Sequence, residues 1–127
     1  MAIRTELTIR LLNNPGMLSK VCQIIADEHI NIVALNLASP VILRLMVDNP
    51  VHASSVLREH NYHVEEREVL FTTVPNGPGS LVRVTRLIAD ADINMEYLYA
   101  TALEDQPMAS LVVGVPDAER ASAATGV

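Results

Sequence analysis

Apolar residues recur along the chain at two different spacings, and these spacings predict strands and helices. Residues 7–12 form a short apolar run rich in β-formers, which is typical of a strand. Residues 13–16 (Asn-Asn-Pro-Gly) break the run, because proline lacks a backbone donor and glycine accepts positive φ. Apolar residues then follow at helical spacing and form one stripe of a helix that we expect to end near residue 29: Leu18, Val21, Cys22 and Ile25.

The next segments complete a small α+β unit. Residues 32–38 and 41–48 read as two strands joined at Ser39-Pro40, and residues 51–60 read as a helix with Asn49-Pro50 near its start. Residues 62–66 would form a fourth strand. The predicted order is β-α-β-β-α-β, the split βαβ arrangement, in which two helices cover one face of a four-stranded antiparallel sheet.

The chain then repeats itself. The segment NNPGMLSKVCQIIADEHINI, at 13–32, aligns without a gap with NGPGSLVRVTRLIADADINM, at 76–95, an offset of 63 residues. A period of this length is too long for a solenoid unit and indicates a duplicated small domain. The identical pairs include the asparagines, prolines and glycines of the break: Asn13/Asn76, Pro15/Pro78, Gly16/Gly79, Leu18/Leu81, Val21/Val84, Ile25/Ile88, Ala26/Ala89, Asp27/Asp90, Ile30/Ile93 and Asn31/Asn94.

The second copy carries a longer turn and an early end. Its two middle strands are predicted at 95–103 and 108–115. Leu45, Val47 and Pro50 align with Leu111, Val113 and Pro116 at an offset of 66, so three extra residues fall around 104–107. After Pro116 the chain has room for a small helix and no fourth strand. The second sheet therefore has three strands, or it borrows an edge from elsewhere.

The repeat boundary is placed between residues 66 and 67, which gives repeats at 1–66 and 67–127. No turn signal separates the fourth strand of the first repeat from the first strand of the second. The segment 62–74 is consequently also compatible with one long extended strand.

Composition narrows the function. Hydrophobic residues make up 50% of the chain and charged residues 19%, which is typical of a folded globular protein. The net charge is −6, with only nine Lys and Arg, and this argues against nucleic-acid binding, which depends on cations that neutralise phosphates. No apolar run is long enough for a signal peptide or a membrane span, and a single cysteine excludes an internal disulfide. We expect a cytoplasmic protein.

The Asn-x-Pro-Gly-x-Leu break after a strand, the amphipathic helix and the Ile-Asn-Ile segment that opens the next strand together resemble the ACT domain family. The resemblance covers nearly the whole chain, twice. It implies a ferredoxin-like fold and a non-catalytic regulatory module that binds an amino acid or a similar small effector. It also implies assembly into an oligomer, expected here to be a homodimer, and control of a metabolic enzyme supplied in trans.

The resemblance places ligand sites between ACT units. One wall is the loop after the first strand and the other is the second-strand region of a neighbouring unit. The implied ligand-binding loop residues are Asn13, Asn14, Pro15, Gly16, Met17 and Leu18, and Asn76, Gly77, Pro78, Gly79, Ser80 and Leu81. The implied strand residues are Asn31, Ile32 and Val33 in one copy, and Asn94, Met95 and Glu96 in the other.

Elementary chemistry supports the loops as carboxylate sites. A helix start exposes unpaired N–H groups and a partial positive charge, and a glycine there lets a ligand approach the backbone. The same Pro-Gly pairs also serve as structural turns. Asn31 and Asn94 either contact ligand or occupy a left-handed bend between helix and strand.

The remaining chemistry-bearing residues suggest no catalytic, cofactor or metal site. Cys22 reads as a small buried residue on the apolar stripe rather than a reactive thiol, and His60 and His63 lack the carboxylate or cysteine partners that a metal site needs. Tyr97 and Tyr99 share one sheet face, where they line an interface or cover the sheet. The alternative to a ligand-binding role is an interaction module that dimerises, or docks on an enzyme, without binding ligand.

Overall fold

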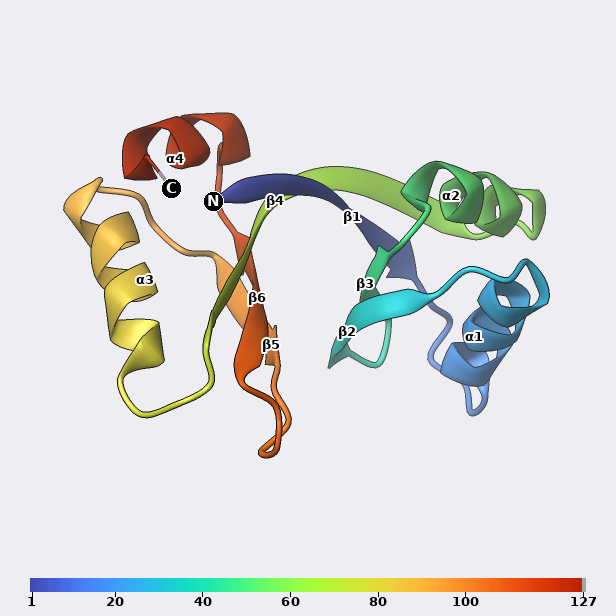
Figure 1. Ribbon diagram of the computed structural model, residues 1–127. Helices are drawn as coiled ribbons and strands as arrows, with labels where there is room; N and C mark the ends of the chain where they lie inside the picture. The colour runs from blue at the N-terminus through green and yellow to red at the C-terminus, as the bar shows by residue number, and fades with distance from the viewer. Residues whose placement is uncertain (127) are drawn as a thin grey trace. The chain divides into compact units, whose positions relative to one another are not determined.

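The computed structural model describes residues 1–126, which fall into two compact units, each with its own core (Figure 1). One unit is formed by residues 5–67, and the other by residues 1–4 together with residues 68–126. The chain therefore passes between units near residues 4 and 5 and again near residues 67 and 68. The repeat boundary predicted from the sequence lies one residue before the second of these points.

The unit at 5–67 has the predicted split βαβ arrangement. Its elements are β1 (Ala2–Arg10), α1 (Met17–Asp27), β2 (Ile32–Ser39), β3 (Ile42–Val47), α2 (Pro50–Glu59) and the first part of β4 (His63–Pro75). The strand order is β2-β3-β1-β4, and β3 is antiparallel to both of its neighbours. The two helices contact each other on one face of the sheet (Figure 1).

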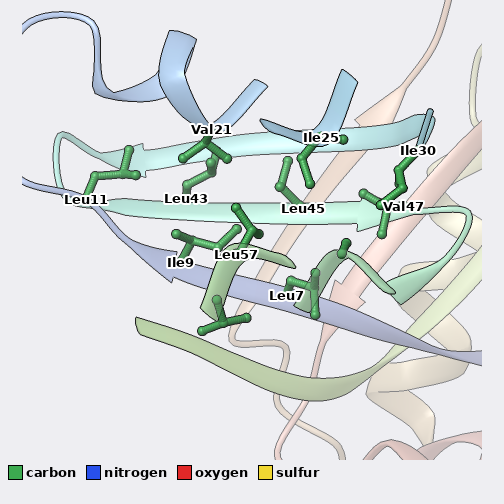
Figure 2. Close-up of a cluster of buried hydrophobic side chains, with 12 residues drawn as sticks. Leu7, Ile9, Leu11, Val21, Ile25, Ile30, Leu43, Leu45, Val47 and Leu57 are labelled. Carbon is green, nitrogen blue, oxygen red and sulfur yellow. The ribbon is translucent and has the colours of Figure 1, made fainter. Parts of the chain in front are cut away.

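The core of this unit is aliphatic and lies between the helices and the sheet. Figure 2 shows Val21 and Ile25 on α1 facing Leu43 and Leu45 on β3. All four side chains are at most 1% exposed. The predicted helical stripe is therefore confirmed at Val21 and Ile25, whereas Cys22, at the edge of the stripe, is only half-buried.

The second unit repeats the arrangement with a different fourth strand. It contains the rest of β4, α3 (Ser80–Asp90), β5 (Tyr97–Thr101), β6 (Met108–Gly114) and α4 (Ala118–Thr125). Its strand order is β1-β4-β6-β5, so the first residues of β1 occupy the edge for which residues 68–126 supply no strand. Met1 is 5% exposed in the core of this unit, and its carbonyl accepts a 2.7 Å hydrogen bond from Ser122 Oγ on α4.

Several element bounds differ from the sequence prediction. β1 begins at Ala2 rather than at residue 7 and ends at Arg10, and β5 covers only Tyr97–Thr101 of the predicted 95–103. In place of the predicted segment 62–74, His63–Pro75 form one continuous strand, β4, as the missing turn signal allowed. The left-handed residues that follow α1 and α3 are His29 (φ 55°) and Asp92 (φ 57°), not Asn31 and Asn94, because each helix ends earlier than expected.

The predicted offset of 66 residues between the later parts of the repeats is also wrong. Strand pairing joins Leu7 to Leu45 and, in the second copy, Leu70 to Val113, so Leu45 corresponds to Val113. The N-caps Asn49 and Asp117 give the same offset of 68. Since β2 and β5 keep the offset of 63, the turn between β5 and β6 is longer by five residues, not three.

Candidate functional site

The two predicted loops have nearly identical backbone geometry. Gly16 is the N-cap of α1 at φ 82° and ψ 1°, and Gly79 is the N-cap of α3 at φ 81° and ψ −1°. Both glycines are left-handed, a conformation that other residues rarely adopt. Neither helix has a side-chain hydrogen bond at its cap. The first-turn N–H groups therefore have no capping side chain, which favours a negatively charged group at this point.

The second unit contains a cavity of about 360 Å³ at this loop. One wall is formed by the end of β4, the loop at 76–79 and the first turn of α3. The other wall is formed by the C-terminal end of β5 and the N-terminal end of β6. Of the predicted site residues, Asn76, Gly77, Gly79, Ser80 and Leu81 line it. The sequence analysis missed the remaining lining residues, which are all apolar: Val74, Pro75, Val82, Ala100, Ala102, Ala109 and Leu111.

Small residues open this cavity. Leu37 pairs with Leu43 in the first unit, and Ala100 pairs with Leu111 in the second. Because Leu111 is equivalent to Leu43 at the offset of 68, Ala100 is equivalent to Leu37. Ala109 pairs with Val74 in the second unit, and the carbonyl of Val41 accepts a hydrogen bond from the N–H group of Leu11 in the first. Ala109 is therefore equivalent to Val41. Comparing the two repeats position by position would have found both alanines, had the offset of 68 been known.

Asn76 forms hydrogen bonds with the long turn between β5 and β6. Its Nδ2 donates to the carbonyl of Leu103 at 2.6 Å and to that of Gln106 at 3.0 Å, and its backbone N–H donates to the carbonyl of Pro107 at 2.9 Å. The amide nitrogen thus fixes the turn against the loop rather than facing an open site. These hydrogen bonds join the loop and the turn along one rim of the cavity.

The loop of the first unit is arranged differently. Met17 and Leu18 are half-buried and pack against the core of that unit, while Asn13, Asn14, Pro15 and Gly16 are exposed. Met17 also lines a separate cavity of about 380 Å³, whose other walls are the end of β1 and residues 60–63 after α2. Pro78, in the second unit, lines a neighbouring cavity of about 350 Å³ together with Met1 and Arg83.

The predicted strand residues lie away from these loops within each unit. Ile32 pairs with Val47, whereas the loop follows Arg10, which pairs with Ile42 at the other end of β3. Asn31 is held by Asp48, since its N–H donates to Asp48 Oδ1 and its carbonyl accepts from Asp48 N–H, both at 3.1 Å. Asn94, Met95 and Glu96 likewise precede β5 at its opposite end from the cavity. A site made of both loop and strand residues would need the loop of one ACT unit and the strand of another, and it stays a prediction.

Other candidate groups have local partners. The His60 ring lies 2.9 Å from the carbonyl of Val56, and the His63 ring lies 3.2 Å from Glu65. Among residues 1–126 no cluster of three or more His, Cys, Asp or Glu side chains could hold a metal ion. No helix in that range is long and apolar enough to cross a membrane. Tyr97 and Tyr99 stack with ring centroids 6.3 Å apart, as their shared sheet face predicted.

Comparisons with known proteins agree on one family. A family model described as an ACT domain pair matches residues 1–124. No curated protein sequence matches the chain.

Solved structures resemble the chain over nearly its whole length. The structure of protein BT0572 from Bacteroides thetaiotaomicron is 28% identical, with a TM-score of 0.89 over 98% of this chain and 87% of that one. The regulatory subunit of aspartate kinase from Thermus flavus is 16% identical, with a TM-score of 0.65 over 98% and 94% of the two chains. Escherichia coli aspartokinase III in complex with lysine and aspartate is 22% identical, with a TM-score of 0.58 over 94% of this chain and 30% of that one. At such identities the two kinase structures show a common fold.

Proposed function

The chain belongs to the family of ACT domain pairs, and from that premise we propose that it is a non-catalytic regulatory protein that binds a small molecule, most simply an amino acid. The proposed site is the loop between the first strand and first helix of a repeat, with walls supplied by the ACT units around it. Binding would alter the contacts of the protein with itself or with a metabolic enzyme.

The observation that carries this proposal is the cavity beside the uncapped start of α3. An amino acid combines a carboxylate with a side chain of a few atoms. The N–H groups of Ser80 and Val82 donate to the carbonyls of Gly77 and Gly79, which leaves the N–H group of Leu81 and the partial positive charge of the helix start for the carboxylate. The adjoining apolar space of about 360 Å³ suits the side chain.

The chemistry of the cavity wall favours binding over catalysis. The residues that line it are Val, Pro, Asn, Gly, Ser, Leu and Ala, so none supplies a titratable acid or base. The one amide side chain among them donates to two turn carbonyls. General acid–base mechanisms need a titratable group, and the hydroxyl of Ser80 would need an adjacent general base to act as a nucleophile, so this wall lacks the groups that either mechanism requires.

The two aspartokinase comparisons support a regulatory role by analogy. One neighbour is the regulatory subunit of aspartate kinase, a chain of similar length to this one. Another is an aspartokinase in complex with lysine and aspartate, in which the matched part is a minor share of the enzyme. An ACT pair that stands beside a catalytic partner is the arrangement we propose here.

Thermal unfolding against the twenty amino acids tests the proposal. A ligand present at 100 times its Kd stabilises the folded protein by about 2.7 kcal/mol, which shifts the midpoint by several degrees. We expect one amino acid, or one group of similar amino acids, to shift the midpoint at millimolar concentration. If none of the twenty changes the midpoint, the amino-acid-binding role is wrong.

A second candidate function is an interaction module that assembles without ligand. It is favoured by edge strand β2, on which Leu35 and Leu37 are 39% and 45% exposed. Unpaired edge strands with exposed apolar side chains readily pair with another chain. Sedimentation of the full chain with and without amino acids separates the two functions, because an interaction module gives an oligomer whose mass does not respond to any amino acid.

A further inference from the structure

We infer that the second repeat alone holds the ligand, and that the ligand side chain is aliphatic and uncharged, of the size of leucine, isoleucine, methionine or valine. This inference rests on the proposed function and narrows it to one site and one chemical class. It follows from three size differences between repeats that otherwise share their loop geometry.

The first step is that the two loops differ in the space beside them, not in their backbone. Gly16 and Gly79 agree within 1° in φ and 2° in ψ. The residue after each glycine is Met17 in the first repeat and Ser80 in the second. Met17 packs against the core of its unit, whereas Ser80 lines the cavity.

The second step concerns the opposite wall, where the same exchange of large for small occurs twice. Leu37 and Val41 in the first repeat correspond to Ala100 and Ala109 in the second, and both alanines line the cavity. Ser80 on α3, Ala100 on β5 and Ala109 on β6 are thus all smaller than their equivalents in the first repeat, and all three line the same cavity. In the first repeat the described cavity near Met17 has neither Leu37 nor Val41 in its wall.

The third step fixes the class of ligand. The cavity wall carries no charged side chain, and its one amide nitrogen already donates to the carbonyls of Leu103 and Gln106. A lysine or aspartate side chain placed there would lose water and gain no partner of opposite charge. An aliphatic side chain gains from leaving water, and the loss of one methylene typically weakens binding by roughly 10-fold or more in such a pocket.

The test fills the cavity with the residues that the first repeat already uses. Ala100→Leu and Ala109→Val place the side chains of Leu37 and Val41 at their equivalent positions, so the fold has a precedent for both. The matched controls, Leu37→Ala and Val41→Ala, make the reverse change in the first repeat. Each full-length variant is melted with L-leucine, L-isoleucine, L-methionine, L-valine, L-alanine, L-lysine and L-aspartate, and the unliganded midpoint reports folding.

We expect the aliphatic amino acids to raise the midpoint of the wild-type chain, with alanine at least 10-fold weaker than leucine. Ala100→Leu and Ala109→Val should each weaken that response at least 10-fold, whereas both control variants should keep it. If an amino acid stabilises the chain but the cavity-filling variants respond normally, the site lies elsewhere. If lysine or aspartate is the effective ligand, the aliphatic class is wrong. In both cases the proposed function survives and this inference fails, while a chain that responds to no amino acid removes both.

Discussion

The left-handed glycines illustrate how a single residue fixes the start of each helix. Gly79 has φ 81°, whereas Gly77, two residues earlier in the same loop, has no positive φ, and a Cβ at either position would meet nothing within 4 Å. We therefore predict that Gly79→Ala costs about 1–2 kcal/mol through backbone strain alone. Gly77→Ala should cost little, and Gly79→Asn less than alanine because asparagine tolerates this conformation. Urea unfolding of the three variants measures the difference, and equal losses at both positions would refute the strain argument.

Gly114 is required for a different reason, which is the ring that lies over it. Gly114 pairs with Tyr97 across β5 and β6, and a Cβ at Gly114 would overlap the Tyr97 ring. Tyr97 in turn stacks on Tyr99. We predict that Gly114→Ala displaces the ring and costs about 1–3 kcal/mol.

A double-mutant cycle isolates the Gly114 effect. In a Tyr97→Ala background the added methyl group has no ring to displace, so Gly114→Ala should cost at least about 1 kcal/mol less than in the wild-type chain, a coupling of the size expected for residues in contact. Both changes are measured by denaturant unfolding. Additive losses would mean that the backbone, and not Tyr97, demands glycine at this position.

At the scale of elements, the second helix of each repeat has the same kind of side-chain cap, but the two helices differ in length. Asn49 Oδ1 accepts from His52 N–H at 3.2 Å at the start of α2, and Asp117 Oδ1 accepts from Arg120 N–H at 3.0 Å at the start of α4. α2 has a proline in its first turn and runs for ten residues, whereas α4 runs for eight. A shorter helix has fewer internal hydrogen bonds, so its cap contributes a larger share of its stability.

We therefore predict that Asp117→Ala costs about 1–2 kcal/mol and that Asn49→Ala costs about 1 kcal/mol. Hydrogen exchange of the α4 amides should rise in Asp117→Ala, while the amides of α1 and α2 keep their protection. Replacement by serine, which also caps, should restore most of the loss. A variant Asp117→Ala with unchanged exchange in α4 would contradict the role of the cap.

Most of the fold could be predicted because the signals for its elements are local. The helical stripe that contains Val21 and Ile25 follows from side-chain spacing, and the gapless match of residues 13–32 with residues 76–95 can be read directly from the sequence. The 66-residue offset failed for a physical reason. Sliding a strand by two residues keeps the same side chains on the same face, so Leu45 matches Leu111 and Val113 equally well in an apolar pattern. Only the hydrogen-bonded register between strands separates the two alignments.

The candidate site was only half predictable from sequence. Its loop is visible because Pro-Gly after a strand is typical of a helix start, and this pattern pointed to five residues that line the cavity: Asn76, Gly77, Gly79, Ser80 and Leu81. Ala100 and Ala109 were missed because their contribution is an absence of side-chain volume, which an isolated alanine does not signal. Asn76 was given a ligand role because no local pattern reveals that a turn some 27 residues away would use its amide nitrogen.

At the scale of the whole molecule, two strands connect the units in the chain. β1 contributes residues 2–4 to the second unit and residues 5–10 to the first, and β4 is divided between residues 67 and 68. Residues 68–126 contain no fourth strand after β6, only α4. The sheet of the second unit is completed by the opposite end of the sequence, where Met1 is buried and bonded to Ser122.

Because residues 1–4 belong to the second unit, fragments that contain one repeat each should differ in their ability to fold. A fragment of residues 5–67 keeps all four strands and both helices of its unit, whereas a fragment of residues 68–127 lacks the edge strand and the buried Met1. Since a unit of about 60 residues is marginally stable even when complete, losing an edge strand should prevent folding. We predict dispersed amide NMR signals and a cooperative melt for 5–67, and neither for 68–127. A chain of 5–127 should retain the first unit but lose protection in α4, and a well-folded 68–127 fragment would show that β1 is dispensable to the second unit.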